Sequence, residues 1–398
     1  MLCITNYLFI IYNILMSSLT RAIVRTKNTF KIFGLLIGII LFIWIIFLIV
    51  SSLANNAKIS YKSSIAQNGF GNIPHLKFHS YVLPKGDNPS YVMALPSGTF
   101  PSYPRVMKVY NMPYNSININ SLNNAELFAG ELGFKSSSYV EKTPSLYTWS
   151  TSQHVLTFDI SNFNFTLYTL QSIYNYMQYQ INNNQSIGGF NGTENLSLFF
   201  STLLSSLSYT NSTGSSIPLV SNINQNNFYS VPVTINSDNT ISISNSTGSI
   251  PNAYYIFYNN YIGNYKVYNP NPKKPLDRVL TDSTNVSYKS ILSLNFSNFN
   301  INENNSSTYY IISPQEAFSN MQNGKGSLEL IYPSGGNPYS NTQNVQSVSK
   351  FYIDHMSLGY YGGVSYHKYL EPIYVFSGIV YFSNGKEGTF YYYVNALS

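Results

Sequence analysis

The chain has 398 residues, with 21 Lys and Arg against 15 Asp and Glu, and a single cysteine, Cys3. Only 9% of the residues are charged, whereas 16% are aromatic and 37 are Tyr. So many aromatic residues can bury a large core, which excludes a disordered chain, and one cysteine excludes a disulfide scaffold. The formal charge of +6 is concentrated near the N-terminus at Arg21, Arg25, Lys27 and Lys31, and the rest of the chain carries 17 basic against 15 acidic residues. A nearly neutral body excludes a nucleic-acid-binding protein.

An uncharged apolar run of nineteen residues extends from Ile32 to Val50. Because about 20 such residues cross a bilayer, we predict a transmembrane helix over 32–50 with the lipid membrane as its partner. A cleaved signal peptide ending near Ala54 is the alternative, although apolar regions of signal peptides are usually only about 7–15 residues long. The positive-inside rule applied to the four cations gives a cytoplasmic leader over 1–31 and an extracellular location for the bulk of the chain. Residues 1–15 are either an interfacial helix or untranslated, with the true start at Met16.

A polar stretch over 51–101 is typical of a stalk or an irregular lead-in. A first module follows over 102–170. It opens with a strand over 103–110 and a helix that has Ser121 as N-cap and Gly133 at its end. The apolar face of this helix comprises Leu122, Ala125, Phe128, Ala129 and Leu132. Alternating polar and apolar residues then predict strands over 146–150, 154–160 and 164–170.

A second module over 171–275 has the same order of elements. Helices are predicted over 171–181 and 195–207. Strands are predicted over 228–235, 240–244, 253–258 and 265–268. The sequence from Asn269 to Pro275 contains three prolines and breaks regular structure, which makes it a candidate domain boundary.

The third module spans 276–398. Its sequence predicts a strand over 285–301 and then a helix, which begins with the capping box of Ser313 and Glu316 and a proline at N1. That helix carries Phe318 and Met321 toward a sheet and ends at Asn323-Gly324. Strands are predicted over 327–332, 345–360, 372–382 and 389–395, the last two joined by a hairpin at Asn384-Gly385. The predicted fold class is α+β, a single N-terminal transmembrane helix followed by tandem modules of helices packed on antiparallel sheets.

Candidate functional residues fall into two groups. Asn-x-Ser/Thr sequons make candidate glycosylation sites of Asn164, Asn184, Asn191, Asn195, Asn211, Asn245, Asn285, Asn295, Asn304 and Asn305. The tyrosines Tyr360, Tyr361, Tyr391, Tyr392 and Tyr393 form a candidate partner surface, because tyrosine offers a flat apolar face with a polar tip. The alternative is that strand alternation buries about half of these tyrosines.

Catalytic signatures are weak. His75 and His79 have the spacing of a helical metal pair, but the adjacent proline disfavours a helix there. Ser347 and Lys350 match S-x-x-K without its companion motifs. We therefore predict that the protein is not an enzyme and needs neither a cofactor nor a metal ion.

Four segments of the C-terminal module carry a resemblance to a known family, namely Ile312–Ala317, Leu358–Tyr361, Leu370–Phe376 and Tyr393–Ala396. Together they resemble the C-terminal domain pattern of YycH/YycI-type proteins, over about residues 285–398. These are bacterial membrane-anchored regulators that contact a sensor histidine kinase outside the cell. The resemblance implies an extracytoplasmic regulator.

Two functions remain open. The first is a non-enzymatic, membrane-anchored accessory or regulatory protein that binds another envelope protein or polymer. The alternative is a structural component of a cell or virus surface that assembles through its β-sheets. A monomer after removal of the anchor would favour the first function, and ordered oligomers would favour the second.

Overall fold

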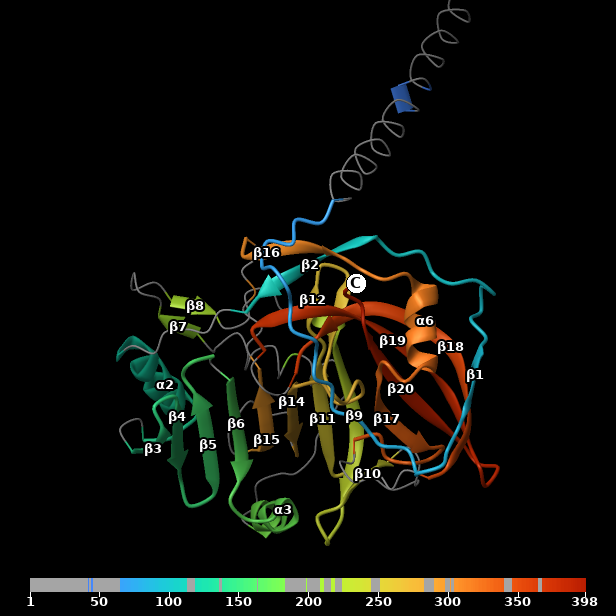
Figure 1. The fold of residues 1–398 in the computed structure, drawn as a ribbon. Helices are drawn as coiled ribbons and strands as arrows, with labels where there is room; N and C mark the ends of the chain where they lie inside the picture. Colours follow the sequence, from blue (N-terminus) through green and yellow to red (C-terminus); the bar gives the residue numbers. More distant parts are fainter. Residues whose placement is uncertain are drawn as a thin grey trace, which may run out of the picture. The chain divides into compact units, whose positions relative to one another are not determined.

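The structure is a computed structural model of the whole chain (Figure 1). The residues that it describes are 42, 44–45, 65–112, 119–135, 138–162, 164–182, 198, 208–210, 216–218, 224–244, 251–282, 290–297, 301, 304–339, 346–363 and 367–398. The chain divides into two compact units, Met1–Ile65 and Ala66–Ser398. All the named strands and helices below belong to the second unit.

One large sheet, here called the middle sheet, contains nine described strands in the order β10-β9-β11-β14-β15-β6-β5-β4-β3. Neighbouring strands in this sheet are antiparallel. The strands are β3 (Tyr139–Thr143), β4 (Leu146–Ser150), β5 (His154–Asp159), β6 (Asn164–Thr169), β9 (Phe228–Ile235), β10 (Ile241–Ile243), β11 (Ala253–Tyr258), β14 (Asp277–Thr281) and β15 (Ile291–Phe296).

The second large sheet, here called the C-terminal sheet, is built around the long hairpin of β18 (Val348–Tyr361) and β19 (Tyr369–Phe382). Strand β18 also pairs in parallel with β1 and β13, while β19 pairs with β20 and β2. Its other strands are β1 (Ser90–Met93), β2 (Val106–Asn111), β12 (Tyr261–Ile262), β13 (Tyr265–Tyr268), β16 (Ser306–Tyr310), β17 (Ser327–Pro333) and β20 (Glu387–Asn395). A small separate pair joins β7 (Ser208–Thr210) and β8 (Ser216–Pro218), and a 3₁₀ turn covers Gln225–Asn227.

The named helices of the described chain cover the sheets. Helix α2 (Ile119–Glu131) packs Phe128 against Phe158 and Phe165 of the middle sheet, with ring centroids 5.3 and 4.6 Å apart. Helix α3 (Ile173–Asn182) places Tyr176 and Met177 in a second core formed with β9, β11 and β14. Helix α6 (Pro314–Gln322) packs onto the C-terminal sheet.

Local sequence signals account for the ends of α6. Ser313 Oγ accepts a hydrogen bond from the Glu316 amide at 3.1 Å, and proline occupies the first turn. The chain leaves the helix at Asn323, and Gly324 takes a positive φ of 68°. These features confirm the predicted cap and stop. Helix α2 begins at Ile119, so Ser121 is a buried residue inside the helix and the predicted N-cap is wrong.

The predicted fold class is wrong. The described structure is predominantly β, with two large sheets, and the strands do not close into three tandem modules. Strands β14 and β15, expected in the third module, lie between β11 and β6 of the middle sheet, while β2 pairs with β19. The physical reason is that each sheet is completed by strands from segments far apart in the sequence. Grouping consecutive elements into modules does not predict such pairing. The module boundaries at 102, 171 and 276 stay a prediction.

No helix in the described part of the chain is long and apolar enough to cross a membrane. The predicted transmembrane helix over 32–50 is corrected accordingly, together with the signal-anchor and the single-pass cell-membrane location that depend on it. Within that range only Phe42, Trp44 and Ile45 are described, as exposed helical residues. The other residues of the run, and Arg21, Arg25, Lys27 and Lys31, lie outside the described residues.

The segment 66–104, which contains most of the predicted lead-in over 51–101, runs along the C-terminal sheet. The Gln67 amide donates to the Thr308 carbonyl at 2.9 Å, and the Tyr81 amide donates to the Leu328 carbonyl at 2.8 Å. Strand β1 then adds to β18, with Tyr91 stacked on Phe351. We call this segment the strap.

Candidate ligand-binding cleft

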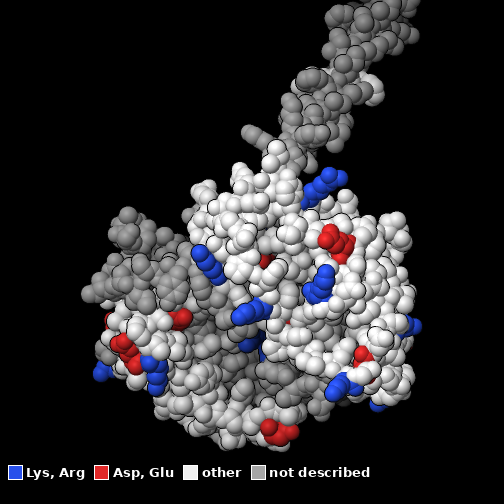
Figure 2. All heavy atoms as spheres, in the orientation of Figure 1, with Lys and Arg blue, Asp and Glu red and all other residues white. Residues whose placement is uncertain are grey.

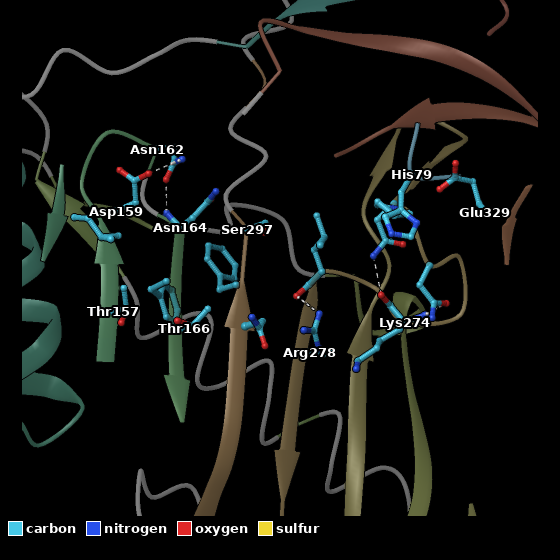
Figure 3. A pocket seen from close by; sticks show the side chains of 18 of the residues that line it. His79, Thr157, Asp159, Asn162, Asn164, Thr166, Lys274, Arg278, Ser297 and Glu329 are labelled. Carbon is cyan, nitrogen blue, oxygen red and sulfur yellow. Dashed lines mark hydrogen bonds between the residues drawn. The ribbon is translucent and has the colours of Figure 1, made fainter. Parts of the chain in front are cut away.

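A cleft of about 600 Å³ opens between the middle sheet and the C-terminal sheet, with residues of both in its lining. Volumes of roughly 300–1,000 Å³ are usual for small-molecule sites. Figure 3 shows Asp159, Asn162 and Asn164 at one end of the cleft, and Arg278 followed by Lys274, His79 and Glu329 toward the other end. The lining is rich in polar side chains, although few charged groups lie on the face of the molecule seen in Figure 2.

The floor of the cleft is a row of four side chains on four adjacent strands. The strand register pairs Thr157 with Thr166, Thr166 with Asn295, and Asn295 with Arg278. All four residues line the cleft. Since neighbouring strands are about 4.8 Å apart, three intervals give a polar row roughly 14 Å long.

A second row of polar side chains lies two residues away from the first row along each strand. Asp159 pairs with Asn164, and Ser297 follows directly after β15. Asp159 accepts hydrogen bonds from Ser161 Oγ at 2.6 Å and from Asn162 Nδ2 at 3.1 Å. Asn162 Oδ1 in turn accepts a hydrogen bond from the backbone amide of Asn164 at 2.9 Å. This turn therefore fixes the acidic end of the cleft.

Strand alternation explains why these polar residues share one face. Successive side chains of a strand point to opposite sides of the sheet. Phe158, Leu167 and Leu294 alternate with the polar residues and lie in the core that α2 covers. The polar rows are consequently held on the opposite face by a well-packed apolar layer.

The basic end of the cleft comes from the proline-rich loop between β13 and β14. Asn271 Oδ1 accepts from the amides of Lys273 and Lys274 at 3.0 and 3.2 Å, and Asn269 Nδ2 donates to the Lys274 carbonyl at 2.7 Å. Lys274 Nζ donates to the Tyr339 carbonyl at 3.2 Å. Burial, and then the nearby positive charge of Arg278, lower the pKa of Lys274 to about 8.

The side chain of Arg278 is held in place by backbone carbonyls of the loop just before it. Its Nη1 donates to the carbonyls of Pro275 and Leu276 at 3.0 and 3.3 Å. The adjacent Asp277 faces the other way, accepting from Asn260 Nδ2 at 2.7 Å and from the Ser297 amide at 2.6 Å. Burial lowers the pKa of Arg278, but a guanidinium stays charged in proteins.

The opposite wall carries Glu329, which sits at a bulge in β17 between Leu328 and Leu330. Bulges redirect side chains and are common beside functional sites. Glu329 is 1% exposed, and its Oε1 accepts from Ser327 Oγ at 2.6 Å. Burial raises the pKa of Glu329 to about 8, so this carboxyl is mostly neutral at pH 7.

The structure places the candidate glycosylation sites in different settings. Asn164 and Asn295 are strand residues that line the cleft, while Asn304 and Asn305 lie just before β16. The remaining sequons, at Asn184, Asn191, Asn195, Asn211, Asn245 and Asn285, lie outside the described residues.

The five tyrosines of the candidate partner surface lie largely in the core. Tyr360, Tyr361, Tyr392 and Tyr393 are all under 9% exposed. Tyr391 is half-buried, with Lys273 Nζ 5.5 Å from its ring centroid. The Tyr393 hydroxyl donates to the Asn269 carbonyl at 2.8 Å and so supports the loop that carries Lys274.

The residues weighed for catalysis are not brought together. His79 reaches the cleft, whereas His75 does not line it. Ser347 Oγ donates to Asp87 Oδ1 at 2.6 Å. Among the described residues, no three His, Cys, Asp or Glu side chains are grouped to hold a metal ion.

Comparisons with known proteins identify no family for the chain. No protein-family model matches it, and no curated protein matches it. A search of solved structures finds a crystal structure of an uncharacterized protein from Eubacterium rectale, 11% identical, covering 74% of this chain and 84% of that chain with a TM-score of 0.36. A likeness at this level establishes neither fold nor function, and the resemblance to YycH/YycI-type proteins stays a prediction.

The residues of the cleft were not predicted from the sequence to form a common site. Lys274 lies in the segment that we predicted as a breaker and a boundary, and Asn164 and Asn295 were selected only as sequons. The sequence does show polar residues on one face of the predicted strand over 164–170. Their alignment with Asn295 and Arg278 depends on the pairing of β6 with β15, two segments more than 100 residues apart, which no local pattern predicts.

Proposed function

We propose that this protein works by binding rather than by catalysis, and that its cleft holds a short segment of a polar polymer, an oligosaccharide of about three sugar residues. The observation that carries this proposal is the row of Thr157, Thr166, Asn295 and Arg278 along the floor. Its length of roughly 14 Å, set by the strand spacing, is that of a trisaccharide.

The chemistry of the lining supports a carbohydrate ligand. Hydroxyl and amide side chains both donate and accept hydrogen bonds, as sugar hydroxyls do. The rows project from regular strands backed by a packed core, so the polar groups are held in position before a ligand arrives. Such preorganisation reduces the entropic cost of binding.

Isothermal titration calorimetry with cellotriose, chitotriose and trigalacturonate tests this function. Thr166→Val removes a hydroxyl from the floor while keeping the shape of the side chain. The loss of one hydrogen bond should raise Kd about 2- to 10-fold for any trisaccharide that binds.

Thr148→Val is the matched control, because Thr148 pairs with Thr157 in the same register but lies on β4, outside the cleft lining. It should bind like the unmodified chain. Failure of all three sugars to bind, or equal effects of the two substitutions, would contradict the proposal. Ordered oligomers in analytical ultracentrifugation would instead favour the structural surface component.

A further inference from the structure

Lys274 and Arg278 bring two positive charges to the same end of the cleft. Both residues line it, and the positive charge of Arg278 acts on Lys274 and helps to lower its pKa. Figure 3 shows the two side chains beside one another below His79. Like charges placed together in a partly buried site are unfavourable unless an anion is bound between them.

The acidic groups that line the cleft do not neutralise this pair. Asp159 lies at the far end of the row and is bonded to Ser161 and Asn162. Glu329 is mostly neutral at pH 7 because burial raises its pKa to about 8. The adjacent Asp277 accepts hydrogen bonds from Asn260 and the Ser297 amide. Its charge also acts on Arg278, but burial raises the pKa of Asp277 to about 7, so this carboxyl is only partly charged at pH 7.

The guanidinium of Arg278 retains donors for a ligand. Both of its hydrogen bonds within the described part of the chain use Nη1, and its Nε and Nη2 donate to no residue there. The N–H groups at Nε and Nη2 form a planar fork that matches the two oxygens of a carboxylate. Lys274 adds a point charge next to this fork.

We propose that this end of the cleft binds the carboxylate of an acidic sugar, so that the ligand is an oligosaccharide containing uronic acid. This inference rests on the proposed function and adds the substrate class and the direction of binding. One carboxylate of the ligand lies at Arg278, and hydroxyls of the ligand lie along Asn295, Thr166 and Thr157.

The experiment compares trigalacturonate with its fully methyl-esterified form, which has the same skeleton without the charge. We expect the acid to bind about tenfold or more tightly than the ester to the full chain. In Arg278→Gln this ratio should fall close to one. Arg278→Lys should restore only part of it, because lysine keeps the charge and lacks the fork.

Lys273→Gln provides the matched control. Lys273 is the neighbouring cation, it lies over the Tyr391 ring, and it is not part of the cleft lining. This variant should keep the full preference for the acid, whereas Lys274→Gln should reduce it. Circular dichroism melting of each variant verifies that the loop substitutions leave the fold intact.

The outcomes separate this inference from the proposed function. Equal binding of acid and ester, or a preference that survives Arg278→Gln, would overturn the inference while the cleft remained a sugar site. Tighter binding of a sulfated trisaccharide than of trigalacturonate would overturn the assignment to carboxylate. Loss of binding for all acidic, esterified and neutral trisaccharides would overturn the proposed function itself.

Discussion

Met321 should contribute more to the packing of α6 than Phe318, although phenylalanine is the larger side chain. Met321 is fully buried, whereas Phe318 is half-buried and contacts Phe376 and Phe100 at centroid distances of 6.3 and 6.0 Å. Met321→Ala should lower the free energy of unfolding by about 2–5 kcal/mol, and Phe318→Ala by less. Urea unfolding followed by circular dichroism measures both values. A larger loss for Phe318→Ala would contradict this ranking.

Single residues were predictable from the sequence where the deciding contact is local. The Ser313 cap depends on an amide three residues away, and it is present as predicted. Glu329 was not predictable, because its direction depends on a bulge formed against β20. Tyr360 and Tyr361 are consecutive and both buried, since β18 has packing partners on both of its faces there.

At the scale of elements, the alternation of polar and apolar residues located strands well. The predicted strands over 228–235, 253–258 and 265–268 coincide with β9, β11 and β13. Strand β1 was missed because it is short and its partly exposed residues alternate only weakly. Its place is decided by pairing with β18, about 260 residues further along the chain.

The strap is held down at Asp87, and this contact can be tested. Its carboxylate accepts hydrogen bonds from Ser347 Oγ at 2.6 Å and from the Val348 amide at 2.7 Å. Asp87→Ala leaves both donors without this partner and should cost about 1–3 kcal/mol of stability. Trypsin should then cleave after the exposed Lys85 faster than in the unmodified chain, as followed by mass spectrometry.

Ser97→Ala is the control for this experiment, because Ser97 also lies in the strap but, among the described residues, forms hydrogen bonds only within its own turn. It should leave the cleavage rate after Lys85 unchanged. An unchanged rate in Asp87→Ala as well would mean that the strap is held by its other contacts, such as the bond from the Tyr81 amide to Leu328.

At the scale of the whole molecule, the error in fold class has one physical cause. We predicted modules by grouping consecutive elements, which assumes that each group buries its own apolar surface. The loop from 269 to 276 instead leads the chain from β13 in the C-terminal sheet to β14 in the middle sheet. The cleft lies where this crossing occurs. Because both the fold and the site depend on long-range strand pairing, neither could be predicted from local sequence patterns.

The low content of charged residues makes a few buried carboxyls important for the whole molecule. Burial raises the pKa of Asp277 and Asp282 to about 7, and that of Glu329 and Glu371 to about 8. All four side chains are under 5% exposed. Because the chain has only 15 acidic residues, these four are a large share of the groups that titrate between pH 4 and 8.

Stability should therefore fall as the pH rises from about 5 to 7.5. In this window the unfolded chain has released protons that the folded carboxyls retain, and a state that binds more protons is favoured at lower pH. His154 and His367 act in the opposite direction, since burial lowers the pKa of both side chains. With four carboxyls against two histidines, we expect Tm to drop by about 5 °C across the window.

In Glu329→Gln the drop should be smaller, with Tm closest to that of the unmodified chain at pH 5. Thermal melts at half-unit pH steps measure both curves, and a Tm that rises toward pH 7.5 in the unmodified chain would contradict the prediction.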